Sequence, residues 1–300
     1  MSAAVQKTEV RTRASILKER ALYVLLVSAA SVAVLGLLLI FVFVALRGAP
    51  IFAKYGVERI LLSADWSPTS GQFGILPFIF GSFAVTFGAL VLGAPLAVAT
   101  AIFLSEVAPP RINAVVRPAV ELLAGIPSVV YGFFGVIIIV PRIRALLGGD
   151  GGGFGLVSAA IVLAIMIVPT IAAISEDAIS AVPRSFREAS AAMGATHWQT
   201  ISGVVLPAAR RGIIDAIVLG MGRAVGETIA VYMVLGNAAV IPRFISDPAA
   251  TLTSIIVLDM PYASGDHQRA LFGIGIVLLL VSMSFVAAIR LLSMKRRGRR

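Results

Sequence analysis

The sequence predicts an all-α integral membrane protein with six transmembrane helices and both termini in the cytoplasm. Of its 300 residues, 59% are hydrophobic and only 13% are charged, and the mean hydropathy is +0.99. A globular domain carries about 25% charged residues. This chain therefore has too few polar side chains to cover a water-facing surface, and lipid is the expected solvent for most of it.

Six apolar runs are long enough to cross the bilayer, which takes about 20 residues of α-helix. We expect a cytoplasmic segment at 1–21, a first span at 22–46, an outer loop at 47–75, a transmembrane domain at 76–292 and a basic tail at 293–300. The other spans are predicted at 76–104, 119–140, 154–175, 213–236 and 271–292. The runs are continuous and lack the alternation of barrel strands, so each is predicted to be a helix.

The positive charges predict the orientation of the chain. With the N-terminus inside, seventeen Lys and Arg residues fall in cytoplasmic segments and seven in outer loops, which is the asymmetry of the positive-inside rule. The closing run from Lys295 to Arg300 fits a topology anchor better than a nucleic-acid patch, so no nucleic-acid partner is expected. Cysteine is absent and only two histidines occur, so neither a metal site nor a catalytic residue is predicted.

The 176–212 loop is the only long loop on the predicted cytoplasmic side, and its sequence indicates two short helices. Capping boxes, in which two side chains each satisfy a backbone N–H, mark the expected helix starts at Ser185 and Thr196. Gly194 suits the left-handed bend between the helices, and Pro207 is expected to stop the second one. A helical elbow of this kind needs a surface to pack on, either lipid headgroups or another protein.

This loop also resembles the EAA motif of ABC importer permeases, which docks into a cleft of a cytoplasmic ATPase subunit. A serine, Ser190, replaces the motif's second alanine. The resemblance implies a docking loop whose matching residues are Glu188, Ala189, Gly194, Ile201, Leu206 and Pro207. Trp198, Ile201 and Val205 would add an apolar stripe to the second helix.

On this interpretation the ATPase is a separate chain. A phosphate-cradling loop needs Gly-Lys followed by Ser or Thr, and none of the lysines here follows a glycine. ATP and Mg are therefore expected on the partner ATPase. This chain is expected to bind no cofactor and not to be an enzyme.

Two charged residues, Arg223 and Glu227, stand inside the predicted 213–236 span. Arg223 lies ten residues after Ile213, or about 15 Å along a helix, near the middle of the bilayer. A charge there costs at least about 2.5 kcal/mol unless it faces protein or water. The i, i+4 spacing places both charges on one face, so we expect an ion pair, either structural or part of a transport pathway.

Small residues recur at four-residue intervals on the same predicted helix: Gly212, Ala216, Gly220 and Ala224. Such ridges let two helices approach closely. We therefore expect the charged residues at a tight helix interface that could part to form a pathway.

The 119–140 span carries a candidate gate made of Glu121, Gly125 and Pro127. Proline removes a backbone donor and clashes with the preceding turn, so a kink is expected there. The kink could be a gate or a packing device. Glu121 is expected to pair with Arg117 at the inner interface or to take part in gating, whereas Glu176 and Asp177 are expected to be solvated.

Two longer strings, ELLAGIPSVVYGFFG at 121–135 and GMGRAVGETIAV at 220–231, resemble the PstC-type permeases of bacterial phosphate importers. The resemblance implies the type I fold of ABC permeases, import of inorganic phosphate across the cell membrane of a bacterium or archaeon, and a requirement for Arg223 and Glu227 in translocation. It implies three kinds of partner: a second, PstA-type permease, a PstB-type ATPase dimer and an extracytoplasmic PstS-type phosphate-binding protein.

Other functions remain open at this stage. The EAA motif does not identify the cargo, so a sulfate or molybdate permease fits as well. An ATP-independent channel or carrier would need neither the docking loop nor an ATPase, and no inverted repeat of the carrier type is evident. An intramembrane enzyme would need a metal dyad, a Ser–His pair or two facing Asp residues within the spans, which the sequence lacks.

Overall fold

The computed structural model describes residues 13–147 and 152–295, so the predicted N-terminal segment and basic tail fall largely outside the described residues. The long helices are α1 (Arg13–Tyr55), α3 (Leu76–Ile102), α7 (Leu156–Ser180), α10 (Leu206–Gly226) and α13 (Gly265–Lys295). The shorter helices are α2 (Val57–Leu62), α4 (Pro110–Ala124), α5 (Ser128–Phe134), α6 (Val140–Leu147), α8 (Arg184–Ala192), α9 (His197–Thr200), α11 (Ile229–Val234) and α12 (Leu252–Asp259). Single π-helical segments occupy Phe103–Val107, Gly135–Ile139 and Ile201–Val205.

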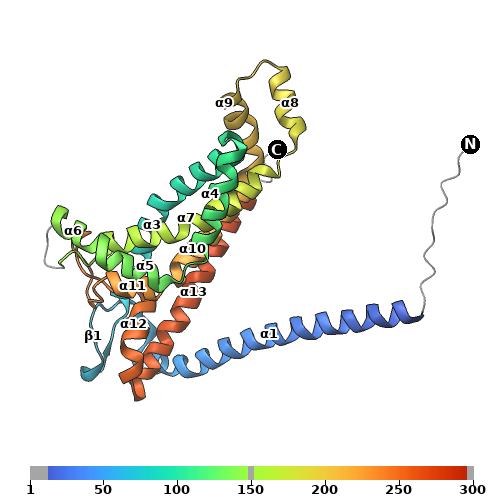
Figure 1. Cartoon of the computed structure of the whole chain (residues 1–300). Coiled ribbons are helices and arrows are strands. Elements are labelled where there is room, and N and C mark those ends of the chain that lie inside the picture. The colour runs from blue at the N-terminus through green and yellow to red at the C-terminus, as the bar shows by residue number, and fades with distance from the viewer. Residues whose placement is uncertain (1–12, 148–151, 296–300) are drawn as a thin grey trace, which may run out of the picture.

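Helix α7 lies at the centre of the bundle, with α3, α4 and α10 packed along it (Figure 1). The predicted small-residue ridge of α10 faces α7. A methyl group at Gly220 would lie 2.4 Å from the side chain of Ile171, and one at Gly212 would lie 2.4 Å from that of Ala178. Alanine is therefore too large at both glycines, and the close approach of the two helices depends on them.

Five helical stretches of the described residues are long and apolar enough to cross a membrane: Arg20–Tyr55, Leu76–Val107, Ser128–Leu147, Leu156–Ser180 and Gly265–Ala287. The predicted 213–236 span is not among them, because it is not one helix. Helix α10 ends at Gly226, Glu227 is extended with ψ 131°, and α11 starts at Ile229. The hydroxyl of Thr253, in α12, donates to the carbonyl of Glu227 at 2.9 Å and stabilises the break between α10 and α11.

The predicted 119–140 span is also divided, more completely than the expected kink. Helix α4 ends at Ala124, and Pro127 becomes the N-cap residue of α5 with ψ 138°. Proline has no N–H to donate to the preceding turn, and it disfavours helical backbone in the residue before it. The outer half of the span then continues through a π-helical segment and α6 to Leu147, so residues expected in an outer loop are helical.

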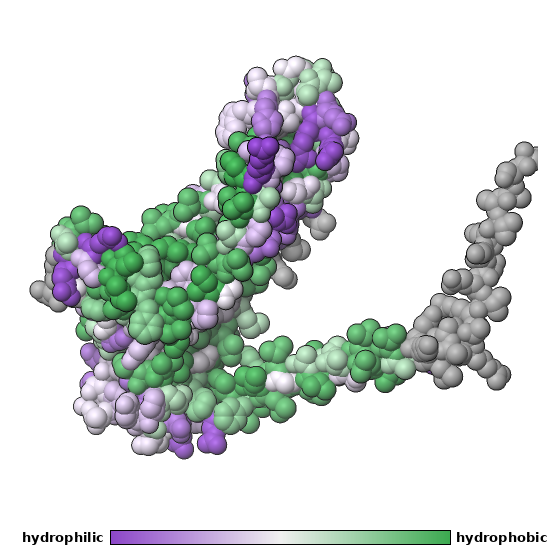
Figure 2. Space-filling model, in the orientation of Figure 1, coloured by the Kyte–Doolittle hydropathy of each residue, from purple (hydrophilic) through white to green (hydrophobic). Residues whose placement is uncertain are grey.

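Helix α1 leaves the bundle as a long arm (Figure 1) and contacts α13 only over its last part. Phe43 and Phe272 meet edge to face with ring centroids 5.6 Å apart, and Gly48 lies directly against the backbone of Gly273. The described side chains before this contact are mostly apolar and almost all exposed. Figure 2 shows hydrophobic residues along the arm and around the middle of the bundle, as expected of surfaces in lipid.

The two ends of the bundle are more hydrophilic than its middle (Figure 2). Helices α8 and α9 project from one end, and α12 lies at the other with a hairpin of two short strands, β1 (Trp66–Ser67) and β2 (Gln72–Phe73) (Figure 1). The hairpin belongs to the expected outer loop but is well packed, because Trp66 stacks edge to face on Phe78 at 5.2 Å and donates to Asp259 at 3.1 Å.

Candidate functional site

The guanidinium of Arg223 is held by two neutral acceptors on two other helices. Arg223 is half-buried in the last turn of α10. Its Nη1 donates to Oγ1 of Thr170 in α7 at 2.9 Å, and its Nη2 donates to the carbonyl of Ala124, the last residue of α4, at 3.4 Å. The charge thus sits at the C-terminal ends of both α10 and α4, where the helix dipoles favour a cation.

The expected ion pair between Arg223 and Glu227 is wrong: no salt bridge joins them, although both side chains are described. An i, i+4 pair needs a continuous helix, and α10 ends between the two residues. Oε1 of Glu227 instead accepts from the backbone N–H of Ala230 at 3.1 Å, in the first turn of α11. Each charge is therefore matched to a helix end of opposite partial charge.

The break between α4 and α5 lies beside Arg223, so Gly125 and Pro127 of the candidate gate share a site with the candidate pathway arginine, whereas Glu121 pairs with Arg117. Pro127 lacks the N–H that would bond the carbonyl of Leu123 in a continuous helix. The hydroxyl of Tyr131 donates to that carbonyl at 2.7 Å, and the next carbonyl, that of Ala124, accepts from Arg223. The break thus exposes two carbonyls, and one of them holds the arginine.

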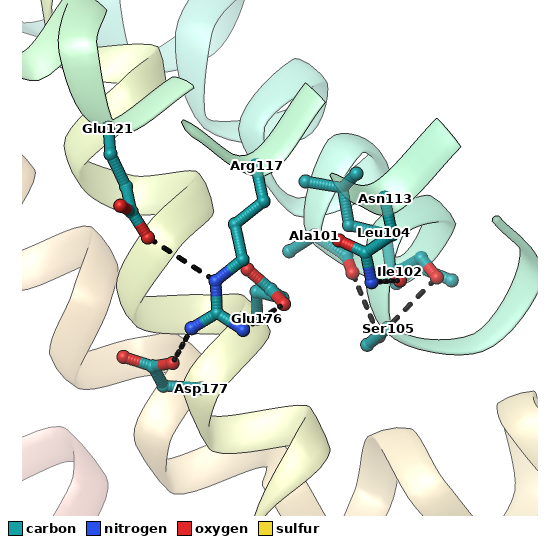
Figure 3. Close-up of polar contacts among 9 residues, drawn as sticks. All are labelled: Ala101, Ile102, Leu104, Ser105, Asn113, Arg117, Glu121, Glu176 and Asp177. Atoms are coloured by element: carbon teal, nitrogen blue, oxygen red, sulfur yellow. Dashed lines mark hydrogen bonds and ion pairs between the residues drawn. The ribbon is translucent and has the colours of Figure 1, made fainter. Parts of the chain in front are cut away.

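A second arginine, Arg117, links α4 to α7 on the side of the docking loop (Figure 3). It lies 3.3 Å from Glu121, 3.2 Å from Glu176 and 3.1 Å from Asp177. The expected pairing with Glu121 is confirmed. The expectation that Glu176 is solvated is wrong, since its side chain is only 4% exposed and Arg117 compensates its buried charge.

The two arginines bridge the same pair of helices at two levels. Ala124 follows Arg117 by seven residues on α4, and Thr170 precedes Glu176 by six residues on α7. At 1.5 Å per residue these separations are about 10.5 Å and about 9 Å. Arg223 and Arg117 are therefore two successive links between α4 and α7, one near the helix break and one closer to the docking loop.

The docking loop forms the predicted elbow, with corrections in detail. Gly194 has φ +83°, the left-handed conformation expected of it, and Thr196 forms the predicted capping box with Gln199. The box expected at Ser185 is wrong, because α8 already begins at Arg184 after Pro183. Pro207 does not stop the second helix. It directly follows the π-helical segment Ile201–Val205 and Leu206, and the chain stays helical from α9 through this segment into α10.

Two of the three residues of the expected apolar stripe face inward and the third faces outward. Ile201 and Val205 are buried against the bundle, whereas Trp198 is 65% exposed. Met193, at the end of α8, is 88% exposed. Glu188 and Ala189 are also exposed, so the EAA residues and two large apolar side chains are available at the tip of the elbow.

The sequence analysis did not identify Thr170 and Tyr131 as residues of the site, and it did not predict that Glu176 is buried. Thr170 follows Pro169 inside a largely apolar run. A polar residue in a membrane-spanning run usually faces other helices, so Thr170 could have been identified as an interior residue. The partners of Arg223 lie 53 and 99 residues away along the chain, so no local pattern could indicate them.

Comparison with known proteins gives one consistent family. Residues 93–298 match the family described as binding-protein-dependent transport system inner membrane component. The chain is 46% identical to the probable ABC transporter permease protein YqgH of Bacillus subtilis (strain 168), over 91% of this chain and 88% of that protein. It is 36% identical to the phosphate transport system permease protein PstC of Pasteurella multocida (strain Pm70), over 83% of this chain and 84% of that protein.

Solved structures share the fold. A chain of a bacterial alginate ABC transporter, crystallised with an alginate-bound periplasmic protein, has a TM-score of 0.68 at 16% identity, covering 96% of this chain and 99% of that one. A chain of the inward-facing methionine transporter MetNI has a TM-score of 0.52 at 23% identity, covering 72% and 93%. The chain is therefore a membrane-spanning permease subunit of an ABC transporter, not itself an enzyme, and belongs to the binding-protein-dependent transport system inner membrane component family.

Proposed function

We propose that this permease imports inorganic phosphate across the cell membrane of a bacterium or archaeon by alternating access, driven by a separate ATPase. The observation that carries the proposal is the environment of Arg223. Its two acceptors are a hydroxyl and a carbonyl, so the guanidinium keeps its full positive charge for an anion. The planar fork of Arg can hold two oxygens of a phosphate at once.

The helix breaks support a transient site. Arg223 lies where α4 gives way to α5 and where α10 approaches its end at Gly226, so its surroundings can change by small rotations of short helices. Hydrogen bonds to neutral groups are weaker than an ion pair, so an oxyanion can displace Thr170 or Ala124 and later be released. A carboxylate partner would compete with the anion instead.

Phosphate is chosen over sulfate and molybdate because of the named relatives, not because of the arginine. An Arg fork accepts any tetrahedral oxyanion. The relatives that carry a cargo in their names at 31–36% identity are phosphate permeases, whereas YqgH is named without a cargo. Sulfate and molybdate therefore remain the alternative cargoes of the same site.

The proposed partners are a PstA-type second permease, a PstB-type ATPase dimer that binds ATP and Mg, and a PstS-type phosphate-binding protein. The exposed elbow of α8 and α9 is the proposed contact with the ATPase, through the EAA residues around Glu188 and Gly194. ATP binding would draw the two docking loops together and open the bundle outward, and hydrolysis would reverse the change.

The test is uptake of radiolabelled phosphate in a bacterial strain that lacks its own high-affinity system and expresses this chain together with a PstA-type permease, a PstB-type ATPase and a PstS-type binding protein. We expect uptake that excess unlabelled phosphate abolishes and excess sulfate or molybdate leaves intact. The Arg223→Gln variant, matched for membrane level, should take up almost none. Uptake of sulfate or molybdate in place of phosphate would overturn the cargo assignment.

A further inference from the structure

The docking loop is tied to the transmembrane bundle by a buried ion pair outside the EAA motif. Nη2 of Arg187, in α8, lies 2.5 Å from Oε1 of Glu106, and Nε lies 3.3 Å from Oε2. The Glu106 side chain is 6% exposed and that of Arg187 is 25% exposed. The same guanidinium donates to the carbonyls of Val182 at 2.6 Å and Ile179 at 3.2 Å. Arg187 thus joins the end of α7, the start of α8 and Glu106.

Glu106 belongs to the π-helical segment Phe103–Val107 that ends α3. Single π-turns occur often at functional sites, because they insert a residue that the regular helix would not present. The same segment is joined to α4: Nδ2 of Asn113 donates to the carbonyl of Leu104 at 3.1 Å (Figure 3). The residues from Glu106 to Asn113 therefore connect the docking loop to the first part of α4.

Helix α4 reaches from this connection to Arg223. Its 15 residues span about 22 Å. Asn113 stands near its start, Arg117 links it to α7 in the middle, and the carbonyl of Ala124 holds Arg223 at its end. Beyond Ala124 the helix breaks at Pro127, so α4 and α5 are not one rigid helix, and the hydrogen bond from Tyr131 to Leu123 joins them across the break.

We propose that Glu106 and Arg187 are positioning residues that transmit movement of the docking loop to α4 and thereby to the carbonyl that holds Arg223. A buried carboxylate is costly to leave unpaired, so the end of α3 follows Arg187 when α8 moves. This inference rests on the proposed docking of an ATPase at the loop, but it is independent of the identity of the cargo.

The movement of α4 can be measured directly, because the chain has no native cysteine. Spin labels at Leu122→Cys in α4 and Leu280→Cys in α13, a helix that is not continuous with the docking loop, lie on side chains that are 75% and 55% exposed. Their separation is measured by pulsed electron paramagnetic resonance in the whole importer complex in nanodiscs, with and without trapped ATP. We expect trapped ATP to shift the distance in the otherwise unchanged complex.

Three substitutions test the link. Arg187→Gln should abolish the ATP-dependent shift while the ATPase still co-purifies, and Glu106→Gln should do the same. Arg187→Lys keeps the charge and should restore part of the shift, which a purely structural role would not require. The control is Arg111→Gln, which removes an exposed positive charge from the first turn of α4 and should leave the shift intact.

A full shift in Arg187→Gln and Glu106→Gln would overturn the proposal, and so would the absence of any shift in the parent complex. Loss of the ATPase from the Arg187→Gln complex would also overturn it, because Arg187 would then be a docking residue. The measurement uses no cargo, so its failure is separate from failure of the phosphate assignment, which only uptake can show.

Discussion

Arg223 and Glu227 lie four residues apart, yet they serve different helices: Arg223 binds the carboxyl end of α4 through the carbonyl of Ala124, and Glu227 caps the amino end of α11. Helix α10 ends between them at Gly226. Two charges that look like a pair in the sequence are thus neutralised separately by helix ends.

Because the two charges are separate, their substitutions should act independently. Glu227→Gln keeps an oxygen that can accept from Ala230, so it should change the free energy of unfolding little. A cycle of Arg223→Gln, Glu227→Gln and the double variant should give an interaction energy below about 0.5 kcal/mol, as for residues without a shared contact. Thermal unfolding of the purified protein measures it, and a coupling well above that limit would re-establish the ion pair.

Lysine at position 223 separates charge from geometry. Its ammonium is a point charge and cannot reproduce the fork that reaches both Thr170 and Ala124. A bound phosphate would then lose one hydrogen bond to a charged group, about 1.5–3 kcal/mol, which predicts at least about a tenfold fall in phosphate uptake for Arg223→Lys. Arg211→Lys, at an exposed position on the same helix, should transport normally. Equal uptake by both variants would show that charge alone suffices.

The hydroxyl of Thr170 should be needed to hold Arg223. Thr170→Val has the same shape but leaves Nη1 of a half-buried arginine without its 2.9 Å acceptor. We expect a loss of about 1–3 kcal/mol in stability, seen as a lower midpoint of thermal unfolding. Thr170→Ser retains the hydroxyl and should recover most of the loss. If Val and Ser variants unfold alike, the hydrogen bond carries no stability.

Gly194 should be required for its backbone conformation and not for space. A Cβ there would meet nothing within 4 Å, but φ is +83°, which a β-branched residue adopts only with strain. Gly194→Val should therefore insert normally and reduce uptake and ATPase co-purification. The matched control is Gly203→Val in the following π-helical segment, which is equally open and is not left-handed. Normal transport by Gly194→Val would remove the bend from the docking mechanism.

Pro127 should keep the carbonyl of Ala124 free for Arg223. With Pro127→Ala the backbone can close into one helix, in which the N–H of Ser128 takes that carbonyl. We expect unchanged or higher thermal stability together with lower phosphate uptake. Pro95→Ala is the control, because α3 continues as a helix through Pro95 and its site is exposed. Undiminished uptake by Pro127→Ala would make the break a packing feature only.

Local sequence patterns were sufficient where one turn decides the structure. The left-handed Gly194, the capping box at Thr196 and the Arg117–Glu121 pair each depend on residues at most four positions apart. The composition likewise predicted helices in lipid. These inferences need no knowledge of tertiary contacts.

The partners of Arg223 and the burial of Glu176 could not be read in this way. They depend on which faces of α4, α7 and α10 meet, and hydropathy alone does not report a break inside an apolar run. The run at 213–236 is apolar enough to suggest one span, yet the helix is interrupted at Glu227, where hydrogen bonds with Ala230 and Thr253 stabilise the break. The error in pairing Arg223 with Glu227 followed from that one assumption of continuity.

The composition of α10 also bears on how the protein is made. This helix carries Arg210, Arg211, Asp215 and Arg223, and it is absent from the five stretches that are apolar enough to span a membrane alone. Arg223 lies near the middle of the apolar run 213–236, where an arginine opposes partition of the run from the translocon by about 2.5–3.5 kcal/mol. Thr170 on the earlier α7 can receive that arginine, so α10 should enter the bilayer only after α7 is in place. The need of Arg223 for an acceptor therefore requires that α7 is inserted before α10.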